Sequence, residues 1–72
     1  MDRAEVQSSN IKSVGYDEKT KTLEVEFIKK GKVFQYSPIT REGYDLLMQA
    51  ESIGEFFSKH IRNNPQVTCT PV

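Results

Sequence analysis

The chain has 72 residues, with 10 Lys and Arg against 10 Asp and Glu and a single histidine. A chain of this length makes one domain and buries only about 60% of its unfolded surface, which leaves little room for an enclosed catalytic cavity. Because the net charge is zero, no overall electrostatic attraction draws the protein to nucleic acid or to an anionic membrane. The lone Cys69 excludes an intramolecular disulfide and favours a reduced, cytoplasmic setting. No apolar run approaches the ~20 residues of a membrane span or forms a signal peptide, so we expect no membrane association.

Three segments with the alternation of β-strands come first, at residues 10–16, 22–27 and 32–37. A turn centred on Lys19-Thr20 pairs Tyr16 with Leu23 and Val14 with Val25. A two-residue turn at Lys30-Gly31 pairs Phe27 with Phe34 and Val25 with Tyr36. Both registers place the same apolar set on one face, namely Val14, Tyr16, Leu23, Val25, Phe27, Phe34 and Tyr36. The opposite face receives Ser13, Glu24, Glu26 and Gln35.

Two helical patterns follow Pro38. Thr40 is placed to cap a helix over residues 41–50, in which Tyr44, Leu47 and Met48 share one side. Ser52 and Glu55 have the spacing of a capping box at the start of a second helix, which runs to about residue 62 and stops at Asn63-Asn64-Pro65. Its expected apolar side consists of Ile53, Phe56, Phe57, His60 and Ile61.

These elements predict an α+β domain, in which a three-stranded antiparallel meander is covered on one face by two C-terminal helices. We expect the domain to span residues 9–64, with residues 1–8 as a flexible N-terminus and residues 65–72 as a flexible C-terminal tail. The run from Val67 to Thr70 is the one part of that tail that could add an edge strand.

An ordered series of residues resembles the KTSC domain family. The series is Ser8-Ser9-Asn10-Ile11, Val14-Gly15-Tyr16-Asp17, Leu23-Glu24-Val25-Glu26-Phe27, Phe34-Gln35-Tyr36, Tyr44, Leu47, Ala50, Ser52, Gly54, Phe57 and Ile61-Arg62. The family occurs at the C-terminus of some bacterial lysyl-tRNA synthetases and as a free-standing small protein. The resemblance therefore implies RNA binding, but it implies no activity and no site residues. The family's Tyr-x-Tyr motif is Phe34-Gln35-Tyr36 in this chain, which lacks the first hydroxyl.

Phe34 and Tyr36 allow two interpretations. Aromatic rings on an open sheet can stack on unpaired bases. The registers instead group these two rings with Leu23 and Val25, which favours a place in the core.

The only basic stretch without acidic residues runs from residue 29 to residue 41. We expect phosphate contacts from its cations, joined by those near the end of the second helix, namely Lys29, Lys30, Lys32, Arg41, Lys59 and Arg62. The alternative is a solvated hairpin tip, whose lysines serve solubility.

No arrangement of residues predicts catalysis, a metal site or a cofactor. His60 is the only histidine, and the expected role of this residue is that of a partly buried structural side chain. The four glycines are scattered and form no phosphate-binding loop.

Two hypotheses for function remain. The first is a non-catalytic module that binds RNA weakly and in a salt-sensitive way through the basic hairpin. The second is a protein-interaction or self-association module, a monomer or weak dimer, that uses an exposed sheet edge or the uncovered sheet face with Ile28, Val33 and Gln35.

Overall fold

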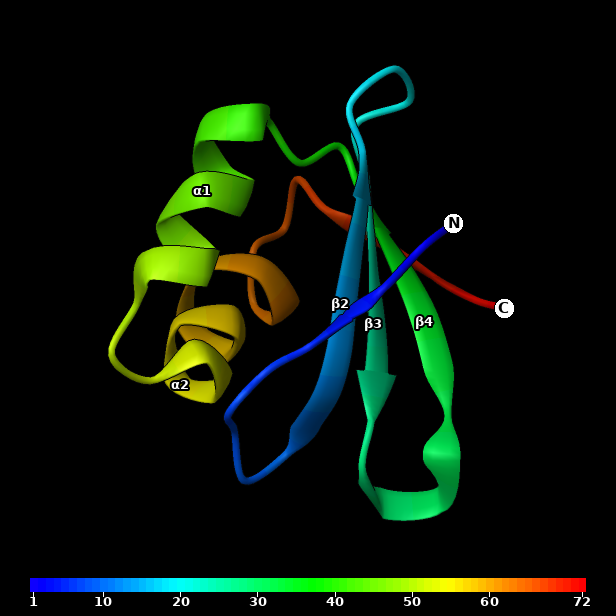
Figure 1. Ribbon diagram of the computed structural model, residues 1–72. Helices are drawn as coiled ribbons and strands as arrows, with labels where there is room; N and C mark the ends of the chain where they lie inside the picture. Colours follow the sequence, from blue (N-terminus) through cyan, green and yellow to red (C-terminus); the bar gives the residue numbers. More distant parts are fainter.

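A five-stranded antiparallel sheet is covered on one side by helices (Figure 1). The computed structural model describes all 72 residues. The strands lie in the sheet in chain order, as β1 (Ala4–Glu5), β2 (Ile11–Asp17), β3 (Thr22–Phe27), β4 (Val33–Ser37) and β5 (Thr68–Pro71). The helical elements are the 3₁₀ turn η1 (Lys29–Gly31), α1 (Arg41–Gln49), α2 (Ile53–Phe57) and the π-helical turn η2 (Ser58–Arg62).

The first hairpin has the predicted register. Val14 lies opposite Val25, and Tyr16 lies opposite Leu23. The Asp17 carboxylate accepts a hydrogen bond from the Lys19 amide at 3.0 Å and so holds the turn that leads into β3. The sequence therefore predicts this pair of strands correctly.

The predicted register of the second hairpin is wrong by two residues. Val25 pairs with Phe34 rather than with Tyr36, which lies opposite Leu23. The connection is longer than a two-residue turn, because it contains η1 and is closed by the Phe27 amide, which donates to the Lys32 carbonyl at 2.8 Å. A shift of two residues leaves every side chain on its predicted face, since the period of a strand is two. The core is consequently unchanged by the error.

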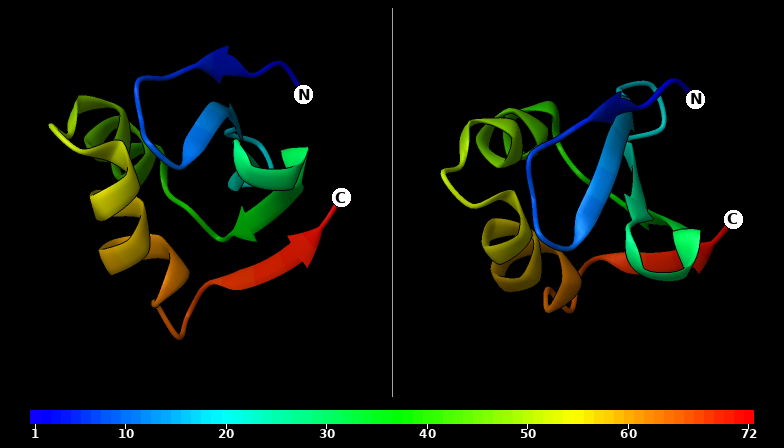
Figure 2. Two further views of the ribbon diagram at one scale, coloured as in Figure 1. Left: turned by 90° about the horizontal axis from the view of Figure 1, so that it is seen from below. Right: turned by 60° about the horizontal axis from the view of Figure 1, so that its bottom comes forward.

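The sheet has two strands beyond the predicted meander, and both come from the expected flexible ends. β1 was not predicted, whereas β5 confirms the edge strand that the run from Val67 to Thr70 could add. At one edge Ala4 pairs with Val14, and at the other Tyr36 pairs with Cys69, so β1 and β5 flank the meander. Figure 2 shows these two strands at opposite edges, with the helices packed on one side. Gly15 permits the approach of the N-terminal segment, because a Cβ atom at this position would lie 2.5 Å from the Asp2 carbonyl oxygen.

Both predicted helix caps are present. The Thr40 hydroxyl accepts a hydrogen bond from the Gly43 amide at 3.0 Å, and the Ser52 hydroxyl accepts one from the Glu55 amide at 3.3 Å. The capping box is only half formed, because the Glu55 carboxylate turns to Lys59, 2.9 Å away.

The second helix reaches residue 62 as predicted, but η2 replaces regular α-helix from Ser58 onward. His60 is exposed, which corrects its expected partly buried place on the apolar side. Its ring packs against that of the half-buried Phe56, with the ring centroids 4.6 Å apart and the planes tilted by 44°.

The core lies between the sheet and the helices. It consists of ten buried hydrophobic residues, namely Ile11, Val14, Leu23, Val25, Tyr36, Ile39, Leu47, Ile53, Phe57 and Ile61. α1 is held against β2 by the stacked rings of Tyr16 and Tyr44, whose centroids are 4.7 Å apart. No helix of the protein has the length and apolar character that a membrane crossing requires.

Candidate functional site

A cleft of about 890 Å³ opens at the end of the sheet that carries η1. The β3–β4 connection forms one side of the cleft, and α2 and η2 form another. Its lining combines apolar residues, short polar residues and four cations, and includes no carboxylate. The residues are Ser9, Asn10, Ile11, Phe27, Ile28, Lys29, Lys30, Lys32, Phe34, Tyr36, Gly54, Phe57, Ser58, Arg62 and Cys69.

The floor of the cleft is aromatic. The Phe27 ring meets the rings of Phe34 and Phe57 edge to face, with centroids 5.9 and 5.7 Å apart. The Tyr36 ring meets that of Phe57 in the same way at 5.0 Å. Edge-to-face contacts add to the energy of burial, and they fix the rings relative to one another. The cleft therefore has a rigid apolar base.

Tyr36 belongs to the core and also borders the cleft. Only 5% of the residue is exposed, which confirms the interpretation of this ring as a core residue, whereas Phe34 is half-buried. Burial raises the pKa of Tyr36 to about 12, and the neighbouring Cys69 thiol adds to this effect while Arg62 opposes it. The Tyr36 hydroxyl is therefore protonated at neutral pH. Cys69 itself is exposed and makes no disulfide.

Four of the six predicted phosphate-binding cations converge on the cleft. Lys29, Lys30 and Lys32 come from the β3–β4 connection, and Arg62 comes from the end of η2. The Arg62 guanidinium lies 5.5 Å from the centre of the Phe27 ring and 5.4 Å from that of Phe57. Such cation–π contacts hold the guanidinium over the aromatic floor.

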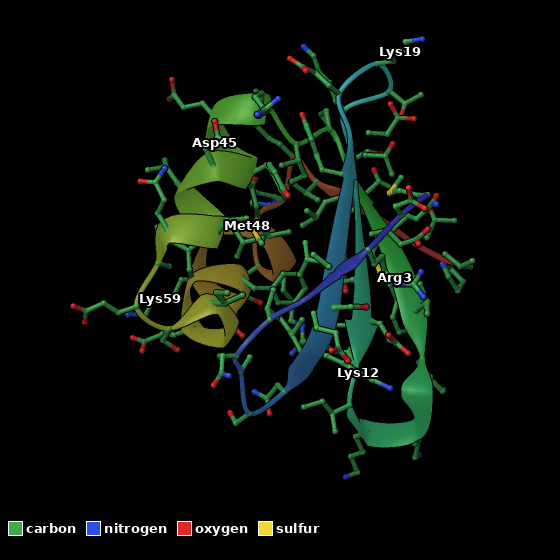
Figure 3. All side chains as sticks on the ribbon, in the orientation of Figure 1. Arg3, Lys12, Lys19, Asp45, Met48 and Lys59 are labelled. Atoms are coloured by element: carbon green, nitrogen blue, oxygen red, sulfur yellow. The ribbon has the colours of Figure 1, made fainter.

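Arg41 and Lys59 do not join this group. Arg41 pairs with Asp45 at 3.1 Å and with Glu18 at 3.3 Å, and these carboxylates raise its pKa. Lys59 pairs with Glu55 and lies on the helical side of the molecule, away from the sheet (Figure 3). Four of the six predicted cations therefore line the cleft, and these two lie elsewhere on the surface, each beside a carboxylate.

The sheet face opposite the helices is closed by a polar network rather than left open. Arg3 pairs with Glu24, and the Gln35 amide donates to the same carboxylate at 2.9 Å. Arg3 also donates to the Ser13 hydroxyl, which in turn donates to Glu26 at 2.8 Å. The Gln35 hydrogen bond, followed by Arg3, holds the pKa of Glu24 below its usual range. Gln35 is thus occupied within the chain.

The wall made by Ser9 and Asn10 was not predicted as part of a site. The Ser8 hydroxyl accepts hydrogen bonds from the amides of Asn10 and Ile11, at 3.2 and 3.3 Å, and so fixes this segment before β2. The segment lies close to α2, because a Cβ atom on Gly54 would meet the Ser8 hydroxyl oxygen at 3.2 Å. No group of three His, Cys, Asp or Glu side chains is placed to hold a metal ion.

The fold and the cleft define a small α+β domain with one basic, aromatic-floored depression. The sequence model of the KTSC domain matches residues 7–64, and the chain belongs to the KTSC domain family.

Two relatives support this assignment. An uncharacterized protein of Stutzerimonas stutzeri (strain A1501) is 37% identical over 59 residues, which are 82% of each chain. The crystal structure of a KTSC domain protein from Yersinia pestis matches with a TM-score of 0.87 at 31% identity, and the match covers 99% of this chain and 96% of that one.

Proposed function

We propose that the protein is a non-catalytic domain that binds RNA in the cytoplasm through the phosphate backbone, with Lys29, Lys30, Lys32 and Arg62 as the contacts. The observation that carries this proposal is the convergence of four cations on one cleft whose lining includes no carboxylate. Such a local excess of positive charge attracts phosphate even though the net charge of the whole protein is zero. tRNA is the first RNA to test, because the family resemblance points to domains attached to lysyl-tRNA synthetases.

The proposal fixes the expected strength of binding. Each phosphate contact contributes about 0.7 to the slope of log affinity against log salt for a single-stranded nucleic acid, so four contacts give a slope of about −3. Binding carried by so few contacts belongs in the micromolar to submillimolar range, at roughly 10⁻⁶ to 10⁻⁴ M.

The chain offers a matched test of charge. The pair Lys29→Glu/Lys32→Glu reverses two cations at the cleft, and the pair Lys19→Glu/Lys21→Glu makes the same change on the first hairpin. Lys19 lies at the end of the sheet opposite η1 (Figures 1 and 3). Titration of the labelled protein with total tRNA, followed by NMR at two salt concentrations, is expected to show at least a tenfold loss of affinity for the first pair alone. Equal losses in both pairs, or shifts that avoid the cleft, would contradict the proposal.

Self-association is the second candidate function. It is favoured by one observation, namely that every residue of β5 is exposed at the outer edge of the sheet. An unpaired edge can add a strand from another chain. Sedimentation at increasing protein concentration tests this candidate, which requires a mass above that of the monomer.

A further inference from the structure

We infer that the cleft takes one unpaired nucleobase, stacked on the Arg62 guanidinium above the aromatic floor, so that the ligand is single-stranded rather than duplex RNA. The inference rests on the proposed function, because it names the class of RNA that the same cleft binds. It also gives the aromatic floor a role, which is to hold the Arg62 guanidinium in place for stacking. Phosphate contacts alone do not need such a floor.

The first argument is the shape and chemistry of the cleft. A volume of about 890 Å³ falls within the range of roughly 300–1,000 Å³ that is usual for small-molecule sites. The outer surface of a duplex presents phosphates and sugars, which cannot cover an aromatic floor, whereas an unpaired base has two apolar faces. Ile28, which is 52% exposed at the rim, adds apolar surface for such a ring.

The second argument is the position of Arg62. Its guanidinium is held over both Phe27 and Phe57, while the residue as a whole remains exposed to solvent. A planar, weakly hydrated guanidinium is a surface on which a base stacks. The two rings below fix its orientation, so less side-chain freedom is lost when the base binds.

The third argument is the polar wall beside the floor. The backbone groups of Asn10 are occupied, because its amide donates to Ser8 and its carbonyl accepts from the Ile28 amide at 2.9 Å. Asn10 lines the cleft, and its side-chain amide carries both a donor and an acceptor. The edge of a base presents the complementary pair of groups, so one side chain can hold the stacked base in place.

The test compares ligands of equal charge. The probes are hexamers of A and of U, a short RNA hairpin that is closed by a non-nucleotide linker and carries the same total number of phosphates, and inorganic polyphosphate of the same charge. Stacking of one base is worth roughly 5- to 150-fold in affinity. The hexamers are therefore expected to bind at least fivefold more tightly than the hairpin or polyphosphate at the same salt concentration.

A matched pair of variants separates stacking from charge. Arg62→Lys keeps the charge at the cleft but removes the planar group, and Arg41→Lys makes the same change outside the cleft. Arg62→Lys is expected to weaken hexamer binding about fivefold or more while polyphosphate binding and the salt slope stay the same, and Arg41→Lys is expected to change neither. Nuclear Overhauser contacts between base protons and the side-chain protons of Arg62, whose guanidinium lies between the base and the rings, are the direct readout.

The outcomes of these experiments distinguish failure of the stacking inference from failure of the proposed function. If the hexamers, hairpin and polyphosphate bind equally, and Arg62→Lys changes nothing, the inference is overturned while the phosphate contacts of the proposed function stand. If no RNA binds, or if the Lys29→Glu/Lys32→Glu pair binds as the natural protein does, the proposed function fails and the inference fails with it. A hexamer preference that is lost in Arg62→Lys and kept in Arg41→Lys, together with weaker binding by the Lys29→Glu/Lys32→Glu pair, supports both.

Discussion

Arg3, which directly precedes β1, pairs with Glu24 of β3 across the intervening strand β2. Glu24 is only 5% exposed, although it lies on the sheet face that the helices leave uncovered. The N-terminal segment thus covers a buried charge and joins three strands on that face.

Because the Glu24 carboxylate is stabilised in the folded protein, we expect the free energy of unfolding to fall in acid. Its pKa is lowered in the folded protein, by the Gln35 hydrogen bond first and by Arg3 second. A lowered folded-state pKa stabilises the fold above the unfolded value of 4.5, and this contribution disappears as the pH falls through the folded-state pKa. Glu24→Gln is expected to cost about 1.5–3 kcal/mol at pH 7, the usual worth of a charge-assisted hydrogen bond, and progressively less as the pH falls below 4.5. Urea unfolding between pH 3 and 7 measures this difference.

The control for this prediction is Glu55→Gln. Glu55 also has a lowered pKa, because of Lys59, but this pair lies exposed on the surface of α2 and η2, where solvent screens it. Little change at any pH is expected. A Glu24→Gln protein that kept the natural pH profile would contradict the role assigned to Glu24.

Gly15→Ala is expected to displace β1. The added Cβ would lie 2.5 Å from the Asp2 carbonyl oxygen and 3.0 Å from the Arg3 side chain, which is closer than real contacts allow. Overpacking of this kind costs about 1–3 kcal/mol. Gly43→Ala in α1 is the matched control, because its Cβ would make ordinary contacts at 3.4 Å or more and would raise helix propensity. Unfolding experiments should give free-energy changes of opposite sign for the two variants.

Lys30 links backbone strain to binding. Its φ angle of 69° lies in the left-handed region, which favours glycine. Lys30→Gly is expected to stabilise the fold by about 0.5–1 kcal/mol, because the left-handed conformation costs a side-chain residue more than glycine loses in entropy. The same change removes one phosphate contact and lowers the salt slope by about 0.7.

Lys29→Gly separates these two effects. The Lys29→Gly substitution removes the same charge from the same turn, but it relieves no strain, because the φ angle of Lys29 is not positive. Weaker RNA binding without a gain in stability is expected. The prediction for Lys30 fails if both variants are stabilised equally in urea.

Because the Tyr36 hydroxyl is buried in its protonated form, we expect the free energy of unfolding to fall in alkali. Burial raises its pKa to about 12, against an unfolded value of 10.0. This contribution is therefore complete below pH 10 and is lost as the pH rises toward 12. Burial also raises the pKa of Tyr16. Absorbance titration of the tyrosines should therefore show a component near pH 12 that is lost in Tyr36→Phe and kept in the control Tyr44→Phe. A component near pH 12 that survives Tyr36→Phe would show that another tyrosine is the buried acid.

The alternation of side chains in β2, β3 and β4 was enough to predict the core face. This alternation did not determine which residue pairs with Phe34, because two registers that differ by two residues place the same side chains on the same face. The conformation of η1 decides between the two registers. β1 has only two residues, too few for a periodic signal. Its place depends on Gly15 and on the Arg3–Glu24 pair, which join residues far apart in the sequence.

The candidate site was predicted in part. The lysines of the basic hairpin were identified from their charge, but the aromatic floor beneath Arg62 depends on contacts between β3 and α2 that no local pattern reveals. The sequence contains one further signal, which distinguishes cations that pair on a helix from those at the cleft. Arg41 and Lys59 each stand four residues from an acidic residue on the same helix, the spacing at which opposite charges pair, which marks both as occupied cations.

β5 contributes Cys69 to the cleft, yet this strand follows the last residue that the family sequence model covers. One wall of the cleft therefore comes from a strand outside the segment that the family sequence model matches, although the Yersinia pestis structure matches 99% of this chain. A protein cut back to the residues that the family model matches would lack this wall, so any ligand of the cleft has to be tested with the full chain.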